Sequence, residues 1–202
     1  MTALVRAVVI FLVKLLAGAQ AYWQGCAPEP RQRIYYANHT SHIDTLAVIA
    51  ALPPSLRPRT HPVAALDYWG SSKLKRYIAV RCLNAVLIDR GGAHERDPLQ
   101  PLADLLERGE SLIIFPEGTR GTGPVGPFKS GLFHLARRFP SAELVPVNIE
   151  NLHRILPKGT WLLVPLICTL RIGAPIHVGV DEPKEAFLTR ARADLIALGR
   201  PV

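Results

Sequence analysis

"RIYYANHTSHIDTLAVIAAL", residues 33–52, decides the fold, because it joins a strand pattern to a helix pattern through a short polar loop. Residues 33–37 are rich in the aromatic and β-branched residues that strands favour. Residues 41–52 have the composition of an apolar helix, which Pro53 and Pro54 end. A strand followed directly by a helix is the repeating unit of an α/β protein.

The same alternation continues to the C-terminus, and 202 residues suit one domain with a sizeable core. The run at 111–115 is apolar throughout, as in a parallel strand that is buried on both faces. We therefore predict a single α/β domain with a mostly parallel sheet covered by helices. Further strands are expected at 62–66, 85–88, 111–115 and 142–149, strand-like runs at 160–164 and 169–178, and helices at 68–80, 95–109, 130–139 and 184–198.

Residues 1–25 are mostly apolar, but Arg6 and Lys14 interrupt them. A spanning helix needs about 20 apolar residues, and a charge in its middle is costly. We interpret this segment as a helical arm at a membrane interface, with Arg6 and Lys14 reaching the headgroups beside Tyr22 and Trp23. A cleaved signal peptide and a helix that only covers the core are the alternatives.

The chain carries a formal net charge of +8, which favours an anionic partner: nucleic acid, lipid headgroups or a phosphorylated substrate. Ordinary solubilising charge is the alternative. Interleaved aromatic and basic residues and any known nucleic-acid module are missing from the sequence, so we expect no nucleic-acid partner. The three cysteines are widely spaced, which predicts neither a disulfide framework nor a metal site and favours a reducing compartment.

Polar residues that can do chemistry follow several of the expected strands. Asn38-His39, Asp89-Arg90, "PEGTR" at 116–120 and Asn148 each come after an apolar run. In an open parallel sheet the ligand lies beyond the carboxyl ends of the strands. We therefore expect these residues to gather on one rim.

His39 and Asp44 are five residues apart, which is a poor contact on one continuous helix. If the helix begins near Ser41, His39 precedes it and can fold back onto Asp44. A carboxylate on Nδ1–H would leave Nε2 as a base. Since no Ser or Cys lies in a nucleophile elbow, the proton donor would be a substrate hydroxyl. The alternative is a capping box of Ser41 and Asp44, and His42 is interpreted as a surface or packing residue.

"FPEGTR", residues 115–120, predicts a tight turn in which Gly118 permits positive φ and Arg120 suits a phosphate. Lys129 stands at the start of the next helix, where an anion is favoured. A plain turn with a solvated arginine and lysine is the alternative.

These motifs together resemble the glycerolipid acyltransferase family, of the 1-acyl-sn-glycerol-3-phosphate (lysophosphatidic acid) acyltransferase type. "NHTSHID" at 38–44 resembles its first motif, "NAVLIDR" at 84–90 its second, "FPEGTR" at 115–120 its third, and "VPV" at 145–147 its fourth. The order and approximate spacing agree across residues 34–150.

The resemblance implies a role for each matching position. His39 would be the general base and Asp44 would orient it. The hydroxyl would then attack acyl-CoA or an acyl-carrier protein directly, with no metal or cofactor. Pro146 would shape the acyl pocket. The implied acceptor-binding set is Arg90, Glu117, Gly118, Thr119 and Arg120, with Lys129 added from its place in the sequence.

The expectation is therefore an O-acyltransferase that converts a lysophospholipid, most simply 1-acylglycerol 3-phosphate, and is peripheral or monotopic on the cytoplasmic face of the inner membrane. Residues 26–202 would form its acyltransferase domain. A lyso-ornithine lipid or another lysolipid as acceptor, and a non-catalytic membrane-binding protein, are the alternatives. The sequence departs from the family at Asn84, where Gly is usual, at Leu87, where Phe is common, and at His42, where an aromatic is frequent.

Overall fold

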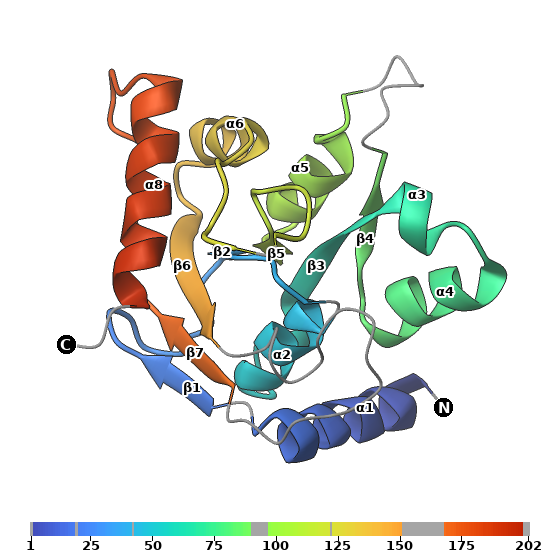
Figure 1. Ribbon diagram of the computed structural model, residues 1–202. Coiled ribbons are helices and arrows are strands. Elements are labelled where there is room, and N and C mark those ends of the chain that lie inside the picture. The colour runs from blue at the N-terminus through green and yellow to red at the C-terminus, as the bar shows by residue number, and fades with distance from the viewer. Residues whose placement is uncertain are drawn as a thin grey trace.

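The computed structural model describes residues 2–18, 20–41, 43–89, 97–121, 123–150 and 168–199 (Figure 1). Five neighbouring strands of its sheet are parallel and extend to one edge. The order across the described sheet is β1-β7-β6-β2-β5-β3-β4. From β6 to β4 all neighbours are parallel, whereas β7 is antiparallel to β6, and β1 is parallel to β7. The predicted mostly parallel sheet is confirmed. The strands are β1 (Gln20–Trp23), β2 (Arg33–Ala37), β3 (Thr60–Ala65), β4 (Val86–Ile88), β5 (Ser111–Ile114), β6 (Glu143–Glu150) and β7 (Thr169–Ile172).

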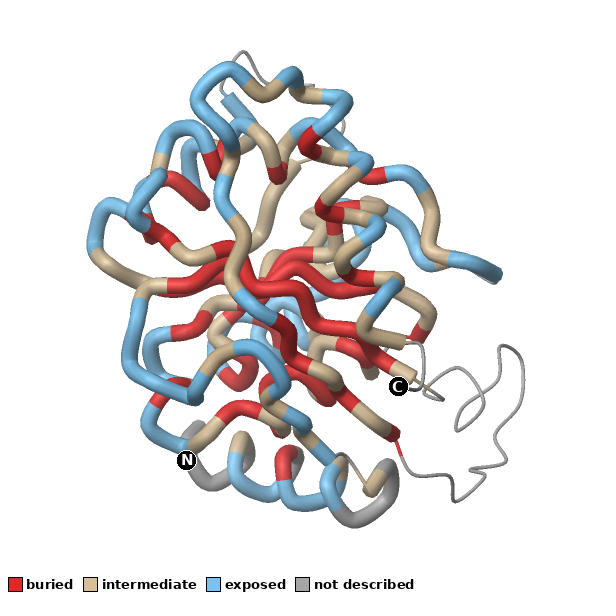
Figure 2. Tube along the Cα trace, turned by 90° about the vertical axis from the view of Figure 1, so that its left-hand side faces the viewer, coloured by how far each residue is buried: buried red, intermediate tan, exposed pale blue. Residues whose placement is uncertain are grey.

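Helices cover both faces of this sheet, as Figure 1 shows. In β2, Tyr35 and Ala37 face α1 and α2, while Ile34 and Tyr36 face α5, α6 and α8. Buried residues are concentrated along the central strands (Figure 2), as expected for a parallel sheet between two helical layers. The helical elements are α1 (Thr2–Ala17), α2 (Asp44–Ala51), η1 (Arg57–Arg59), α3 (Leu66–Trp69), α4 (Lys73–Tyr77), η2 (Ile78–Cys82), α5 (Gln100–Glu107), α6 (Gly131–Arg138) and α8 (Lys184–Leu198).

Several elements differ in extent from the prediction. The helix expected over 68–80 is divided, because α3 ends at Gly70 and Ser72 caps α4 by accepting the Lys75 backbone N–H. Helix α5 begins only at Gln100, after a turn that contains Pro98. The predicted strand at 160–164 lies outside the described residues. Helix α8 has the predicted bounds.

The N-terminal segment is not one helix over residues 1–25. Helix α1 ends at Ala17, and Gln20–Trp23 form β1, because β7 leaves an unpaired edge that this aromatic stretch can extend. Arg6 does not reach outward as predicted, since its guanidinium donates to the Arg57 carbonyl at 2.8 Å and burial lowers its pKa. In the described part of the chain, no helix combines the length and the apolar character that crossing a bilayer would need.

Candidate active site

His39 and Asp44 meet just beyond the carboxyl end of β2. The Nδ1 atom of His39 lies 2.8 Å from Oδ2 of Asp44, whose side chain is fully buried, while 21% of the His39 side chain is exposed. Oδ2 also accepts the backbone N–H groups of Thr40 at 2.6 Å and Ser41 at 2.8 Å. The alternative of a capping box is present only in part. The Asp44 carboxylate accepts the Ser41 N–H, as it would in such a box, but α2 begins at Asp44 itself and its N-cap, Ile43, makes no side-chain cap.

Two neighbours that the sequence did not single out for this purpose fix the position of His39. The Asn38 amide pairs with the backbone of Ile149 on β6, accepting its N–H at 2.8 Å and donating to its carbonyl at 3.0 Å. The Phe115 ring stacks on the imidazole with a centroid separation of 4.3 Å. Phe115 is the first residue of "FPEGTR", so that motif supplies packing for the histidine as well as polar groups.

Glu117 holds two parts of the backbone together. Its Oε1 accepts the N–H of His39 at 2.8 Å, and its Oε2 accepts the N–H of Gly126 at 2.7 Å. The His39 carbonyl in turn accepts the N–H of Gly121 at 2.9 Å. The carboxylate therefore bridges two segments of backbone, and its contact with the acceptor stays a prediction.

Gly118 and Lys129 lie next to each other in the loop that connects β5 to α6. Gly118 has φ +72°, and a Cβ atom there would lie 2.7 Å from the Lys129 Nζ. The positive φ is the reason for glycine here, since a Cβ atom would also displace only the flexible end of the Lys129 side chain. The Lys129 N–H donates to the Pro116 carbonyl at 2.8 Å, which fixes this lysine just before α6.

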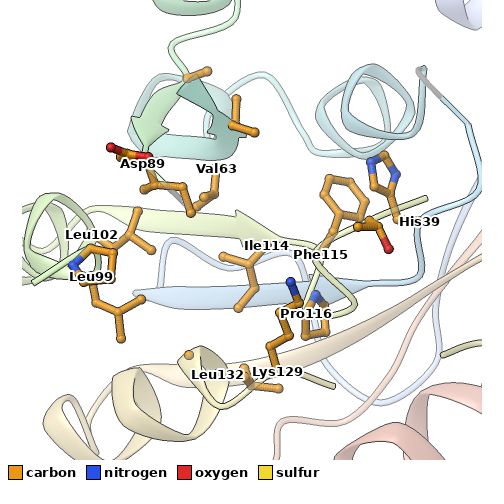
Figure 3. A pocket seen from close by; sticks show the side chains of 18 of the residues that line it. His39, Val63, Asp89, Leu99, Leu102, Ile114, Phe115, Pro116, Lys129 and Leu132 are labelled. Carbon is orange, nitrogen blue, oxygen red and sulfur yellow. The ribbon is translucent and has the colours of Figure 1, made fainter. Parts of the chain in front are cut away.

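A cavity of about 800 Å³ runs from His39 along the α5 and α6 face of the sheet. Figure 3 shows His39 and Phe115 at one end and Leu99 and Leu102 toward the other. This volume lies within the usual range for small-molecule sites. The walls are largely apolar and come from β3, β4, β5, α3, η2, α5 and α6; they include Val63, Leu83, Ile88, Ile114, Leu132 and Leu135.

The structure brings together five of the residues predicted for the site. His39, Gly118, Thr119, Arg120 and Lys129 all line the cavity, with Asp44 buried behind His39. Asp89, at the end of β4, also lines it, whereas Arg90 and His42 lie outside the described residues.

Three other predicted residues are placed elsewhere. Glu117 is not among the described lining residues of this cavity. Neither is Pro146, which pairs with Tyr36 of β2 and accepts the Gly173 N–H. Asn148 lies inside β6 and donates to the Leu195 carbonyl of α8 at 3.2 Å, so it belongs to the core rather than the rim.

Asn84 shows why the family usually has glycine at this position. Its φ is +58°, a conformation that asparagine adopts more readily than other non-glycine residues. The side chain donates to the Pro58 carbonyl at 3.1 Å, and the Asn84 carbonyl contacts Nδ1 of His61 at 3.0 Å. The substitution of asparagine for the family's usual glycine therefore preserves the backbone turn. Asn84 is not among the described residues that line the cavity.

The described residues contain no cluster of three or more His, Cys, Asp or Glu side chains suited to a metal ion. The chemistry that the described geometry supports is proton transfer by His39, beside cationic groups and an apolar wall.

Comparison with known proteins shows which family the chain resembles. The model of the family described as "Acyltransferase" matches residues 25–150. A 1-acyl-sn-glycerol-3-phosphate acyltransferase of Limnanthes alba is 31% identical over 169 residues, which are 82% of this chain and 58% of the relative. The Pseudomonas aeruginosa enzyme of the same name is 24% identical over 191 residues, 92% of this chain and 70% of the relative.

A solved structure has the same fold. The crystal structure of the 1-acyl-sn-glycerophosphate acyltransferase of Thermotoga maritima superposes with a TM-score of 0.69 at 22% identity, covering 98% of this chain and 83% of that one. The family match covers more than half of the chain and includes the His39, Asp44 and "FPEGTR" segments. This chain therefore belongs to the Acyltransferase family.

Proposed function

We propose that this protein is an O-acyltransferase that moves a fatty acyl group from an acyl thioester to the free hydroxyl of a lysophospholipid. The proposed acceptor is 1-acylglycerol 3-phosphate and the product phosphatidic acid. The observation that carries the proposal is His39, bonded through Nδ1 to the buried Asp44, at one end of a largely apolar cavity. The names of the relatives support the choice of acceptor.

The proposed step needs only proton transfer and a direct attack. With Nδ1 directed at Asp44, Nε2 of His39 accepts the proton of the acceptor hydroxyl. The oxygen attacks the thioester carbonyl and the carbon–sulfur bond breaks. The thiolate that leaves takes the proton back from the imidazolium, which the Asp44 carboxylate stabilises in the meantime.

Direct attack agrees with the state of the cysteine thiol near this pair. Burial raises the pKa of Cys168 to about 12, and the Asp44 charge contributes to the increase. A thiol that stays protonated at neutral pH is a poor nucleophile. The proposal therefore includes no acyl-enzyme on Cys168, and acyl-CoA or an acyl-carrier protein is a co-substrate rather than a bound cofactor.

The cationic groups at the cavity suit the phosphate of the acceptor. Arg120 and Lys129 both line it, and Ser130 and Gly131 at the start of α6 line it as well. A guanidinium can meet a phosphate with two parallel hydrogen bonds. The role of Arg90 rests on the family resemblance alone.

The substrate would come from a membrane, so we propose a peripheral or monotopic protein on the cytoplasmic face of the inner membrane. Helix α1 is the proposed contact within residues 1–25, since Val8, Phe11 and Leu12 are exposed while Ile10 packs on the core. The four residues of β1 belong to the sheet of the domain.

The test is transfer of label from radioactive palmitoyl-CoA to a panel of acceptors by purified protein. The panel contains lysophosphatidic acid, lyso-ornithine lipid and lysophosphatidylcholine. Labelled phosphatidic acid with the parent, and none with His39→Ala, is expected. Label in another lysolipid instead would identify that acceptor. A folded protein that labels none of them, with either palmitoyl-CoA or palmitoyl-acyl-carrier protein, would contradict the proposal.

A further inference from the structure

In the part of the chain that the structure describes, the exposed apolar side chains are concentrated in two places. Among the large hydrophobic side chains that the structure describes as exposed, all but Tyr22 and Val180 lie on α1 or on residues 68–80. The second group consists of Tyr68 at 42%, Leu74 at 68%, Tyr77 at 42%, Ile78 at 38% and Val80 at 39% exposed. A contiguous apolar patch on the surface of a protein generally marks an interaction site.

Basic residues accompany this second group. Lys73, Arg76 and Arg81 are exposed, and the Lys75 ammonium lies 4.4 Å from the centre of the Tyr68 ring. The sequence has no acidic residue between Asp67 and Asp89. We call the side chains of Tyr68, Lys73, Leu74, Lys75, Arg76, Tyr77, Ile78, Val80 and Arg81 the α4 surface.

The position of the α4 surface relates it to the cavity and to α1. Tyr68 and Ala79 line the cavity, so this segment is the wall between the cavity and the outside. Helix α1, with its own exposed apolar residues, contacts η2, and Figure 1 shows α4 above one end of α1. The two apolar regions therefore adjoin each other beside the site that contains His39.

We propose that the α4 surface docks on an anionic lipid bilayer, as a second contact in addition to α1. Basic residues beside exposed apolar ones match anionic headgroups above acyl chains. Docking there would place the cavity wall against the bilayer, so that a lipid acceptor could reach His39 without crossing water. The inference rests on the proposed function for its purpose, but its physical test is independent of activity.

The test is co-sedimentation of the full chain with vesicles of phosphatidylcholine alone or with phosphatidylglycerol. Each basic residue near an anionic surface contributes about fivefold to binding, so Lys73→Gln with Arg76→Gln should weaken binding to anionic vesicles about 25-fold and leave binding to neutral vesicles unchanged. Leu74→Ser with Ile78→Ser should weaken binding to both kinds by about tenfold or more.

Matched controls use exposed residues on other elements. Val180→Ser, at a side chain that is 89% exposed, and Arg108→Gln with Arg137→Gln, at two exposed arginines, should bind as the parent does. Melting curves show whether each variant is folded, and Leu74→Ser alone replaces the apolar pair if that pair melts early. The inference would be overturned if the Lys73→Gln, Arg76→Gln variant bound anionic vesicles as the parent does. It would also be overturned if the folded apolar variant bound as the parent does.

Activity on soluble substrates separates this inference from the proposed function. The α4 variants should keep the parental rate with short-chain lysophosphatidic acid and octanoyl-CoA below their micelle concentrations, because none of the substituted residues lines the cavity. If the parent protein is inactive with every acceptor, the proposed function fails while the vesicle result still decides the docking surface.

Discussion

Replacing Glu117 by Gln tests whether this residue positions His39 or binds the acceptor. The carboxylate accepts the N–H of His39 at 2.8 Å and that of Gly126 at 2.7 Å, one with each oxygen. Glutamine offers one acceptor oxygen, and its NH₂ group would face the other N–H. One of the two backbone contacts is therefore lost whichever way the amide is turned.

The size of the effect follows from that lost contact. A hydrogen bond to a charged group contributes about 1.5–3 kcal/mol. At about 1.4 kcal/mol per tenfold change, this corresponds to about a ten- to a hundredfold change in a rate or equilibrium constant. Because one of the two contacts holds the backbone of the proposed base, we expect kcat to fall by up to about that factor, with the acceptor KM changed by less than about threefold. The free energy of unfolding should fall by about the same 1.5–3 kcal/mol.

The assay is steady-state transfer from palmitoyl-CoA to lysophosphatidic acid at varied acceptor concentration, with denaturant unfolding in parallel. Glu107→Gln is the matched control, since Glu107 is 55% exposed and pairs only with the surface residue Arg138. That variant should behave as the parent, because exposed ion pairs contribute little. A large rise in acceptor KM at unchanged kcat and stability would refute the positioning role and restore Glu117 as an acceptor ligand.

Four further outcomes are expected. His39→Ala should abolish transfer in a folded protein, and Asp44→Asn should lower kcat at least tenfold by removing the charge that stabilises the imidazolium; near-normal turnover with a lower Tm would instead make Asp44 purely structural. Arg120→Lys should raise the acceptor KM about ten- to a hundredfold, since lysine lacks the fork that meets a phosphate, and a change in donor KM alone would contradict this. Gly118→Ala should cost about 1–3 kcal/mol of stability, from positive φ and the contact with Lys129, and an unchanged denaturation midpoint would show that the loop relaxes.

The sequence alone determined the class of fold and predicted which residues would form the site. Alternating apolar runs predict the order of strands and helices, because the hydrophobic period is a local property. The residues at the ends of these runs are local too, so His39 and "FPEGTR" could be assigned to one rim by the rule for parallel sheets. The pairing of His39 with Asp44 followed from a helix start that lies between them.

Only the tertiary structure decided what each polar side chain contacts. Asn148 and Pro146 stand near the motifs in sequence, yet β6 directs them to α8 and to Gly173. The sequence predicts Glu117 as an acceptor ligand, and the structure adds its two backbone contacts, with the N–H of the distant His39 and the N–H of Gly126.

At the edge of the sheet, too, the sequence alone did not give the partners of a segment. Residues 20–23 look like the end of an apolar arm, and they become a strand because β7 offers them unpaired backbone groups. The α4 surface likewise reads as an ordinary amphipathic helix until the fold leaves its apolar residues uncovered. Burial and hydrogen-bond partners depend on which segments pack together, and periodicity and composition along one segment do not contain that information.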